Sequence, residues 1–188
     1  MGRAKDIKVK VIQAKIANDF VKKHHYSGSV VQNSVLHFGC FLDGVLGGVM
    51  QYGNSIDKRN VLKLVNTSNK TFNSKWNEML ELNRMAFSNL LPKYSESRCI
   101  AVSVRLIKKN APHIRWLLKN GKKVAKHGTS KKDFTGAKKM SGNQLRYIYL
   151  IDKNATLNVK EISFKKIDEV GAGMYKGKKI TIEKRKLS

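Results

Sequence analysis

The chain has 188 residues, of which 41% are hydrophobic and 27% are charged, so it can bury a core and is not a disordered chain. Its 38 Lys and Arg against 13 Asp and Glu give a formal net charge of +25. A charge of this size attracts polyanions, and nucleic acid is the expected partner. An anionic membrane surface is disfavoured, because the sequence has no long amphipathic helix with a Trp/Phe/Leu face. The length indicates one domain, or one domain with a tail.

The N-terminal half begins with a short strand and a helix. Apolar residues alternate with lysines over residues 7–11, which predicts a half-buried strand. From Gln13 the period changes, and apolar residues such as Ile12, Ile16 and Phe20 are spaced by four, which predicts an amphipathic helix through about Lys23. The run HHYSG at residues 24–28 ends this helix, and Gly28 suits a left-handed stop.

The clearest local signal lies at residues 35–52. Two apolar runs are separated by an Asp-Gly pair at 43–44, which is typical of a tight β-hairpin. Gly39, Gly47 and Gly48 lie within the two strands. Bulges or close strand packing would explain these glycines, and close approach of a ligand is the alternative.

A second helix is predicted from Ser55, with apolar residues up to Val65, and a polar loop follows over residues 66–74. Residues 78–110 then read as a buried strand, a polar loop and a helix that begins abruptly. Ser95 or Ser97 can cap this helix. A strand followed by an exposed helix N-terminus is a natural anion-binding site.

The C-terminal third is more basic. A strand is predicted over residues 114–118, ended by the Asn-Gly pair at 120–121. Residues 119–139 hold eight lysines against one acidic residue and are predicted to be a flexible basic loop. A well-buried strand is expected over residues 145–151. The order of elements indicates an α/β (α+β) fold with a central mixed sheet and helices on both faces.

Neither targeting nor cross-linking signals are evident. Cys40 and Cys99 lie in apolar segments and are expected to be buried free thiols of a reducing compartment. The N-terminus has no apolar core of a secretory signal, Asp6 stands where a myristoylation motif has Ser or Thr, and no apolar run is long enough to span a membrane. We therefore expect a cytoplasmic protein without a membrane partner.

The order of elements resembles the GNAT acyltransferase fold, in which the loop and helix N-terminus after the fourth strand hold the coenzyme A pyrophosphate. Residues 81–87 and 94–107 correspond to that strand and helix. The usual GNAT fingerprint, Gln/Arg-x-x-Gly-x-Gly/Ala, is absent, and Ser-Glu-Ser-Arg at 95–98 stands in its place.

Four longer blocks are similar to phage Mom proteins. They are HHYSG at 24–28, FLDGVLGGVMQYG at 41–53, ELNRMAF at 81–87 and SESRCIAVSVRLIKKNAPHIRWL at 95–117. The resemblance covers roughly residues 7–118 and the strand at 145–152. It implies a GNAT-like domain over residues 1–152 with a basic extension at 153–188.

The Mom resemblance also implies a function. It implies modification of adenine N6 in double-stranded phage DNA, in the host cytoplasm, with acetyl-CoA as donor and iron as a further cofactor in some proposals. The modification hides the DNA from host restriction enzymes. After residue 118 this chain lacks the family's SFADG-like segment, its Cys-Gly pair and its Tyr-containing helix. A DNA-binding relative without turnover, or a GNAT acyltransferase with a non-DNA substrate, are therefore the alternatives.

The resemblance places His25 and Tyr26 where the family's functional His-Tyr pair lies. We predict that they are catalytic, with the imidazole as general base and the phenol as acid. If iron binds, the same two side chains are the expected ligands, because no CxxC or HExxH motif is present. The alternative is a helix-end pair with a solvated His and a packed Tyr.

Ser95, Ser97 and Arg98 are predicted to bind the cofactor, because hydroxyls, helix N–H groups and a guanidinium suit a pyrophosphate. Plain capping beside a surface Arg is the alternative. Arg84 is predicted to join them, since an arginine in an apolar strand needs a partner, either a glutamate at 78 or 81 or a ligand phosphate.

The lysine-rich segments are predicted to contact the phosphates of DNA without reading its sequence. The candidates are Lys122, Lys123, Lys126, Lys131, Lys132, Lys138 and Lys139. Tyr147 and Tyr149 share one strand face and are expected either to pack in the core or to stack on bases. The sequence leaves the oligomeric state open, and a dimer is one option.

Overall fold

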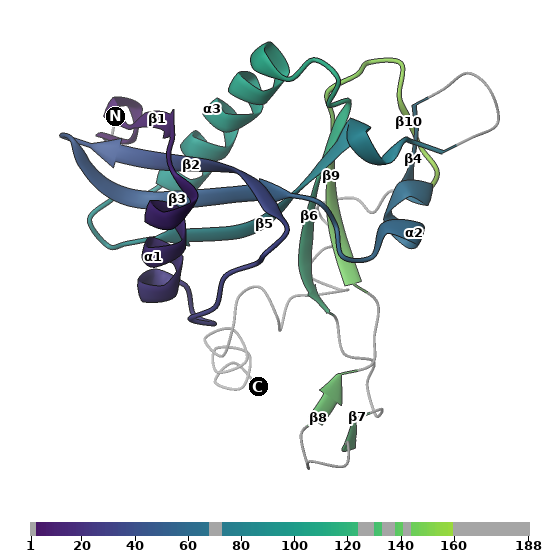
Figure 1. Cartoon of the computed structure of the whole chain (residues 1–188), viewed down its shortest axis with the longest axis horizontal. Helices are drawn as coiled ribbons and strands as arrows, with labels where there is room; N and C mark the ends of the chain where they lie inside the picture. The colour runs from purple at the N-terminus through teal and green to yellow at the C-terminus, as the bar shows by residue number, and fades with distance from the viewer. Residues whose placement is uncertain (1–2, 68–72, 124–129, 133–137, 141–143, 160–188) are drawn as a thin grey trace, which may run out of the picture. The chain divides into compact units, whose positions relative to one another are not determined.

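A computed structural model describes residues 3–67, 73–123, 130–132, 138–140 and 144–159, and only the backbone within 121–145 (Figure 1). The helices are α1 (Ala14–His24), α2 (Lys58–Val61) and α3 (Ser95–Asn110), with short 3-10 turns at Arg3–Asp6, Leu62–Leu64 and Trp76–Glu78. The strands are β1 (Lys8–Val11), β2 (Ser34–Leu42), β3 (Val45–Gly53), β4 (Val65–Asn66), β5 (Met79–Phe87), β6 (Trp116–Lys123), β7 (Ser130–Lys132), β8 (Lys138–Met140), β9 (Gln144–Leu150) and β10 (Thr156–Leu157).

The described residues fall into two compact units. The first unit contains the residues up to Lys119 together with Ile148–Asn158, and the second contains Asn120–Tyr147. The candidate site described below lies within the first unit. The predicted boundary at residue 152 stays a prediction.

The main sheet has the order β1-β2-β3-β5-β6-β9. β1, β2, β3 and β5 pair antiparallel, whereas β5 and β6 pair parallel, so the predicted mixed sheet is confirmed. The parallel pairs join Met79–Glu81 to Trp116–Leu118, and the register stops there although β5 continues to Phe87.

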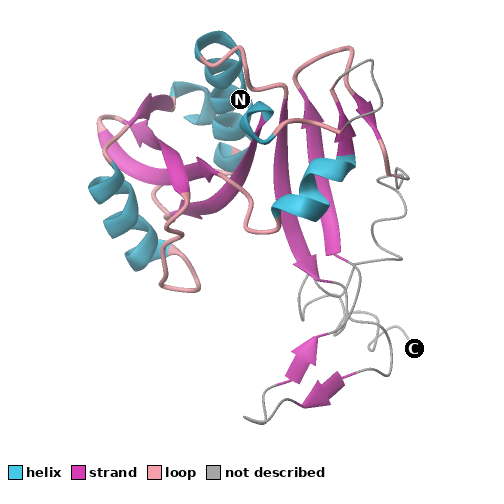
Figure 2. Ribbon diagram, turned by 45° about the vertical axis from the view of Figure 1, so that its right-hand side comes forward, coloured by secondary structure: helices cyan, strands magenta, loops and turns pink. Residues whose placement is uncertain are grey.

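Helices cover both faces of this sheet, as predicted. Val49 of β3 packs with Ala17 and Val21 of α1. The next residue, Met50, packs with Cys99 and Ile107 of α3. Because successive strand residues face opposite sides, α1 and α3 lie on opposite faces (Figures 1 and 2).

The β2–β3 hairpin turns at Asp43 and Gly44, whose φ angles are 51° and 81°. Two successive positive φ angles are the geometry that an Asp-Gly turn adopts, so this prediction is confirmed. The register shifts so that Gly47 has no partner, which makes it the bulge residue. A Cβ on Gly47 would lie 2.7 Å from Leu91 and one on Gly48 would lie 2.7 Å from Phe87, so close packing explains these glycines.

Two local predictions are wrong. The predicted second helix is only α2 and one 3-10 turn, because Val65 leaves the helix to pair with Leu157 of β10. The strand predicted to end at the 120–121 Asn-Gly pair continues as β6 to Lys123.

The segment predicted as a basic loop contains paired strands. β7 and β8 form an antiparallel ladder in which Lys131 lies opposite Lys139, so backbone pairing forms here without an apolar pattern. The predicted DNA-binding residues Lys122, Lys123, Lys131, Lys132, Lys138 and Lys139 lie on strand backbone, and Lys126 lies outside the described residues. Their contact with DNA stays a prediction.

Arg115 joins the start of β6 to the segment that follows β9. Its carbonyl accepts the N–H groups of Ile151 and Asp152, both at 2.9 Å. Its guanidinium pairs with the carboxylate of Asp152 and, at 3.3 Å, with that of Glu78. A backbone hydrogen bond from Asn154 and the pairing with Arg115 lower the pKa of Asp152.

We expect Arg115→Met to lower the free energy of unfolding by about 1–3 kcal/mol, because it leaves two part-buried carboxylates without their cation. Urea unfolding of both proteins measures the difference. Arg59→Met, at an exposed position of α2, is the matched control and should be near neutral. Equal effects of the two substitutions would contradict the assigned role of Arg115.

Candidate active site

The predicted catalytic pair lies in an exposed turn at the C-terminus of α1. The N–H of His25 donates to the carbonyl of Val21 at 2.9 Å, and the helix ends there. The imidazole and the phenol ring of Tyr26 lie side by side, with centroids 4.3 Å apart, and Tyr26 is 89% exposed. Gly28 has the predicted positive φ, 58°, although the helix ends four residues earlier. Tyr26 is therefore not packed. The alternative interpretation of this pair, which required a packed Tyr, is wrong on this point.

Two serines that were not singled out from the sequence complete this turn. Nδ1 of His25 lies 2.8 Å from the hydroxyl of Ser27 and 3.2 Å from the N–H of Ser27. A backbone N–H can only donate, so Nδ1 carries the lone pair and the neutral ring holds its proton on Nε2. The Ser27 hydroxyl also lies 3.1 Å from the hydroxyl of Ser29.

Arg84 reaches this turn from β5. Its Nε donates to the carbonyl of Ser29 at 3.2 Å, and its terminal nitrogen donates to the carbonyl of Asn83 at 3.1 Å. Burial and the nearby Arg84 charge lower the pKa of His25. The structure thus groups Arg84, predicted as a cofactor ligand, with His25, while Glu78 pairs with Arg115 instead.

A buried polar row lies on the α1 face of the sheet. His37, Gln51 and Arg84 are register partners on β2, β3 and β5. Nε2 of Gln51 lies 2.8 Å from Oδ1 of Asn18 on α1 and 3.2 Å from Nδ1 of His37. The side-chain oxygen of Gln51, Oε1, is buried without a hydrogen-bond partner among the described residues. This row ties α1, and hence the His25 turn, to the sheet.

We expect Arg84→Met to raise the pKa of His25, because it removes a cation that disfavours the imidazolium. An NMR titration of the His25 ring measures this shift. The lowered pKa also means that the unfolded chain takes up a proton at His25 before the folded chain does as the pH falls. His25 therefore reduces wild-type stability below the ordinary pKa of 6.5, and Arg84→Met should weaken that dependence. An unchanged titration would show that the Arg84 charge does not act on His25.

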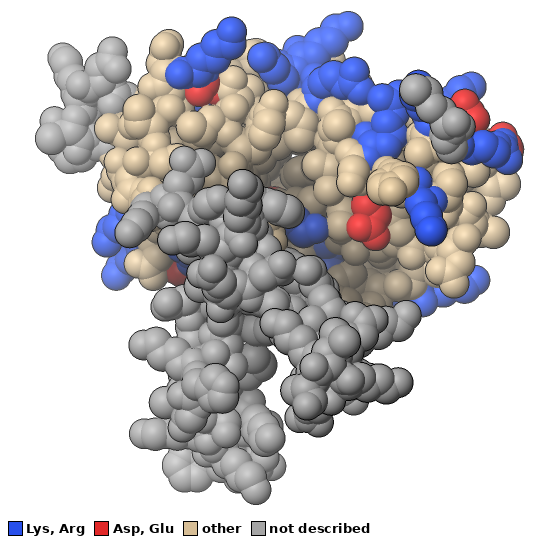
Figure 3. Space-filling model, turned by 180° about the vertical axis from the view of Figure 1, so that it is seen from behind, with Lys and Arg blue, Asp and Glu red and all other residues tan. Residues whose placement is uncertain are grey.

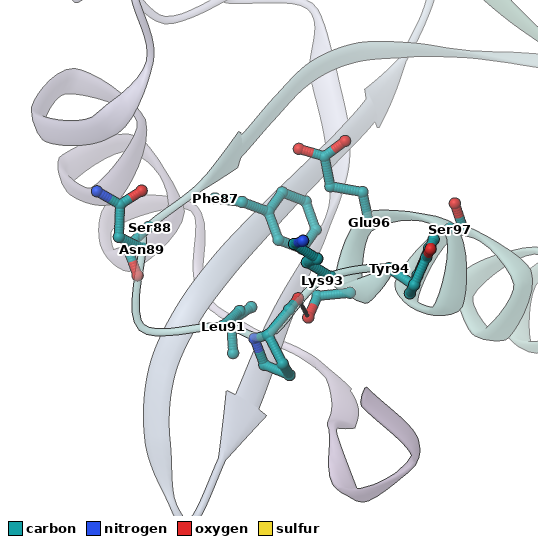
Figure 4. Close-up of a pocket in the computed structure, with 10 residues that line it drawn as sticks. Phe87, Ser88, Asn89, Leu91, Lys93, Tyr94, Glu96 and Ser97 are labelled. Carbon is teal, nitrogen blue, oxygen red and sulfur yellow. Dashed lines mark hydrogen bonds between the residues drawn. The ribbon is translucent and has the colours of Figure 1, made fainter. Parts of the chain in front are cut away.

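A pocket of about 390 Å³ lies where the β5–α3 loop meets the first turn of α3 (Figure 4). The residue before the helix is Tyr94, whose φ of 67° is left-handed and whose side chain makes no capping hydrogen bond. The predicted serine cap is therefore wrong. Ser95 lies inside the helix, buried, and its hydroxyl donates to the carbonyl of Pro92 at 2.5 Å.

This pocket fits a phosphate group. The amides of the first turn of α3 have no side-chain cap, and Ser97 beside them is exposed. Nε of Arg98 is buried without a hydrogen-bond partner among the described residues. Glu96 also lines the pocket and would repel an anion. Of the three residues predicted to bind the cofactor, Ser95 and Ser97 line the pocket and Arg98 does not, and the Ser95 hydroxyl is engaged with Pro92.

Lys119 is a further candidate that the sequence did not reveal. It follows the last β5–β6 pair, and its Nζ lies 3.9 Å from the sulfur of Met85 on β5. Burial lowers the pKa of Lys119, and the negative charge of Glu96 opposes that shift. Lys119 does not line the pocket itself, whereas Glu96, whose charge acts on it, does. In the sequence it was one lysine among many.

Iron binding by His25 and Tyr26 stays a prediction. The described residues contain no group of three or more His, Cys, Asp or Glu side chains placed to hold a metal ion. The Nδ1 lone pair of His25 already accepts from Ser27. Cys40 and Cys99 are buried and free, as predicted, and their mutual hydrogen bond raises the pKa of Cys40.

In the face drawn in Figure 3, Lys and Arg gather along the upper and right-hand part, with fewer Asp and Glu among them. Tyr147 and Tyr149 are 38% and 54% exposed, so the core-packing interpretation is wrong and base stacking stays a prediction. No helix in the described ranges is both long and apolar enough to cross a membrane.

Comparison with known proteins gives a sequence match and a set of structural likenesses. A model of the Mom protein family matches residues 6–120, more than half of the chain. The methylcarbamoylase Mom of Escherichia phage Mu is 31% identical over 115 residues, which are 61% of this chain and 45% of that protein. This chain thus spans less than half the length of that relative.

Two solved structures are among those with partial similarity to this chain. An N-acyl amino acid synthase from uncultured soil microbes has a TM-score of 0.46 at 13% identity, over 77% of this chain and 91% of that one. A GNAT family acetyltransferase from Brucella melitensis, in complex with acetyl-CoA, has a TM-score of 0.40 at 8% identity, over 62% and 76%.

Proposed function

Since this chain belongs to the Mom protein family, we propose that it is a transferase that modifies phage DNA. Its target is the N6 amino group of adenine, its donor is acetyl-CoA, and the modification protects the DNA from host restriction enzymes. The observation that supports this most is the His25 turn. A neutral imidazole there stands beside an exposed tyrosine and a guanidinium, where a macromolecular substrate can reach it.

Charge supplies the affinity for DNA. With a net charge of +25, the chain attracts the phosphate backbone, and Lys and Arg side chains on its surface contact phosphates without reading the sequence. A base inside a duplex must be exposed before its amino group can react. Tyr26, 89% exposed beside His25, offers a ring on which the exposed adenine can stack.

The donor side is the first turn of α3. Its uncapped amides and the Ser97 hydroxyl, which lines the pocket, would hold the pyrophosphate of coenzyme A, and the next residue, Arg98, would add positive charge. Lys119 adds positive charge on the β5–β6 side. When bound, acetyl-CoA supplies an activated acyl group.

We expect Lys119→Met to weaken the binding of coenzyme A about tenfold, because it removes a partly desolvated charge from the binding region. Isothermal titration calorimetry with coenzyme A measures the loss. Lys153→Met, at an exposed position, removes the same charge elsewhere and should leave the affinity unchanged. Unchanged affinity in the Lys119 variant would remove this residue from the donor site.

On the acceptor side, His25 takes up a proton. Its lowered pKa keeps the ring neutral at pH 7, which is the state that a general base needs. Arg84 maintains that state by its charge and orients the turn through the Ser29 carbonyl. The part of β5 that carries Arg84 lies beyond the last β5–β6 pair.

Expression in a bacterium that carries a plasmid tests the proposal. Mass spectrometry of plasmid nucleosides should show a deoxyadenosine of increased mass with the wild-type chain. Unmodified deoxyadenosine from cells that contain folded protein would favour the DNA-binding relative without turnover. A salt titration of DNA binding separates both from an acyltransferase with another substrate, because a shallow dependence on salt counts against DNA as the partner.

A further inference from the structure

His25 can accept a proton at only one atom, and that atom faces Ser27. In the neutral ring Nε2 carries hydrogen, so Nδ1 holds the only lone pair. Nδ1 lies 2.8 Å from the Ser27 hydroxyl and 3.2 Å from the Ser27 N–H. Because the N–H takes part in this contact as a donor, the hydroxyl must donate as well. A substrate amine therefore has no direct path to the basic nitrogen.

The surroundings of the Ser27 oxygen suit a group that gives up its proton. The backbone N–H of Ser29 donates to this oxygen at 3.4 Å, and the Ser29 hydroxyl lies 3.1 Å away. Both can stabilise negative charge on the oxygen. Arg84 holds the same peptide segment through the Ser29 carbonyl at 3.2 Å. Ser27 is exposed, so its hydroxyl is open to a substrate as large as DNA.

We propose that Ser27 is a catalytic proton relay between the acceptor amine and His25. This inference rests on the proposed function. When an amino nitrogen forms a bond to the donor carbon, one of its N–H bonds breaks and the donor's leaving group departs with its bonding electron pair. The released proton passes to the Ser27 oxygen while the Ser27 proton passes to Nδ1 of His25. His25 ends as an imidazolium and returns the proton to water.

A role in the turn alone would also explain the Ser27–His25 hydrogen bonds. That role predicts that any loss in Ser27→Ala follows from a displaced or retitrated imidazole. The relay predicts instead that the ring keeps its tautomer and that turnover falls even at a pH where the ring is neutral in both proteins. The two roles are therefore separated by measuring the state of His25 and the rate in the same variants.

NMR of the His25 ring nitrogens tests the geometry without any DNA assay. The wild-type protein should show hydrogen on Nε2 and a hydrogen-bonded, unprotonated Nδ1 at pH 7. Hydrogen on Nδ1 would overturn the relay whatever the outcome of the DNA assay. If this tautomer is confirmed but the wild-type protein leaves plasmid adenine unmodified, the proposed function fails, and the relay to an adenine amine fails with it.

Rates of adenine modification test the proton transfer. At a pH where NMR shows a neutral His25 ring in both proteins, Ser27→Ala should lose at least about tenfold, and Ser27→Thr should recover most of the rate because it restores a hydroxyl. Ser34→Ala removes a hydroxyl that accepts a hydrogen bond from Asn83 at 3.2 Å, outside this turn, and should match the wild type. Wild-type rates in Ser27→Ala, or a loss that disappears once the His25 ring is neutral in both proteins, would overturn the relay.

Discussion

Adenine modification should fall by about a hundredfold to ten-thousandfold in His25→Ala, which is the usual contribution of a general base. The imidazole is the only neutral base that the structure places in the turn beside Arg84 among the described residues, and its lowered pKa keeps it ready to accept a proton at pH 7. Nucleoside mass spectrometry of plasmid DNA, with equal amounts of folded protein, measures the ratio of modified to unmodified deoxyadenosine.

His24→Ala is the matched control for that experiment. His24 precedes His25, belongs to the last turn of α1, and is exposed with its ring against Phe20 at a centroid distance of 4.3 Å. Among the described residues no hydrogen bond joins His24 to Ser27, Ser29 or Arg84, so modification should stay near the wild-type level. Equal losses in the two variants, or full activity in His25→Ala, would remove His25 from the catalytic step.

Gly53→Ala should destabilise the fold by about 3 kcal/mol or more, because the added Cβ would clash with neighbouring backbone atoms. It would clash with the backbone carbonyl oxygen of Asn33. It would also lie 2.6 Å from the Cα of Ser34 and 2.7 Å from the side-chain nitrogen Nδ2 of Asn83. Two of these three atoms are backbone, and they cannot move aside as a side chain does. The start of β2 would have to separate from the end of β3. Urea unfolding of the purified variant measures this loss.

Gly44→Ala provides the comparison, since it tests backbone conformation without crowding. Gly44 has a φ of 81°, and a Cβ there would meet nothing within 4 Å. Only the cost of a left-handed residue remains, about 1 kcal/mol. If Gly53→Ala were no more destabilising than Gly44→Ala, the close approach of β2 and β3 at Asn33 would be wrong.

The sequence was most informative where the signal is local. The spacing of apolar residues placed α1 to within about one residue at either end, and the Asp-Gly pair placed the β2–β3 turn. The sequence was least informative where distant residues decide. The second helix was predicted too long, because Val65 pairs with Leu157, which lies far along the chain.

The helix cap of α3 failed for a different reason. A serine at the helix start is a good cap in the extended conformation that capping residues adopt. Here Tyr94 occupies the position before the helix with a left-handed backbone, and Ser95 turns its hydroxyl back to Pro92. Nothing in the residue types indicated a tyrosine with positive φ, which is uncommon outside glycine.

The candidate site was only partly predictable. His25 and Tyr26 followed from the family resemblance, because a His-Tyr pair at a helix end has no distinctive spacing of its own. The position of Arg84 beside this pair depends on contacts with Ser29, 55 residues earlier. The buried row of His37 and Gln51 depends on strand register. Polar residues at these two positions of otherwise apolar strands were the available signal.

Label transfer in a purified reaction tests the central claim most directly. The chain is incubated with double-stranded DNA and isotope-labelled acetyl-CoA, the DNA is digested, and the nucleosides are separated by mass spectrometry. The account predicts label on deoxyadenosine, at N6, with the wild-type chain and a loss of that label with His25→Ala. Label absent from every nucleoside, with a chain that binds both DNA and coenzyme A, would contradict it.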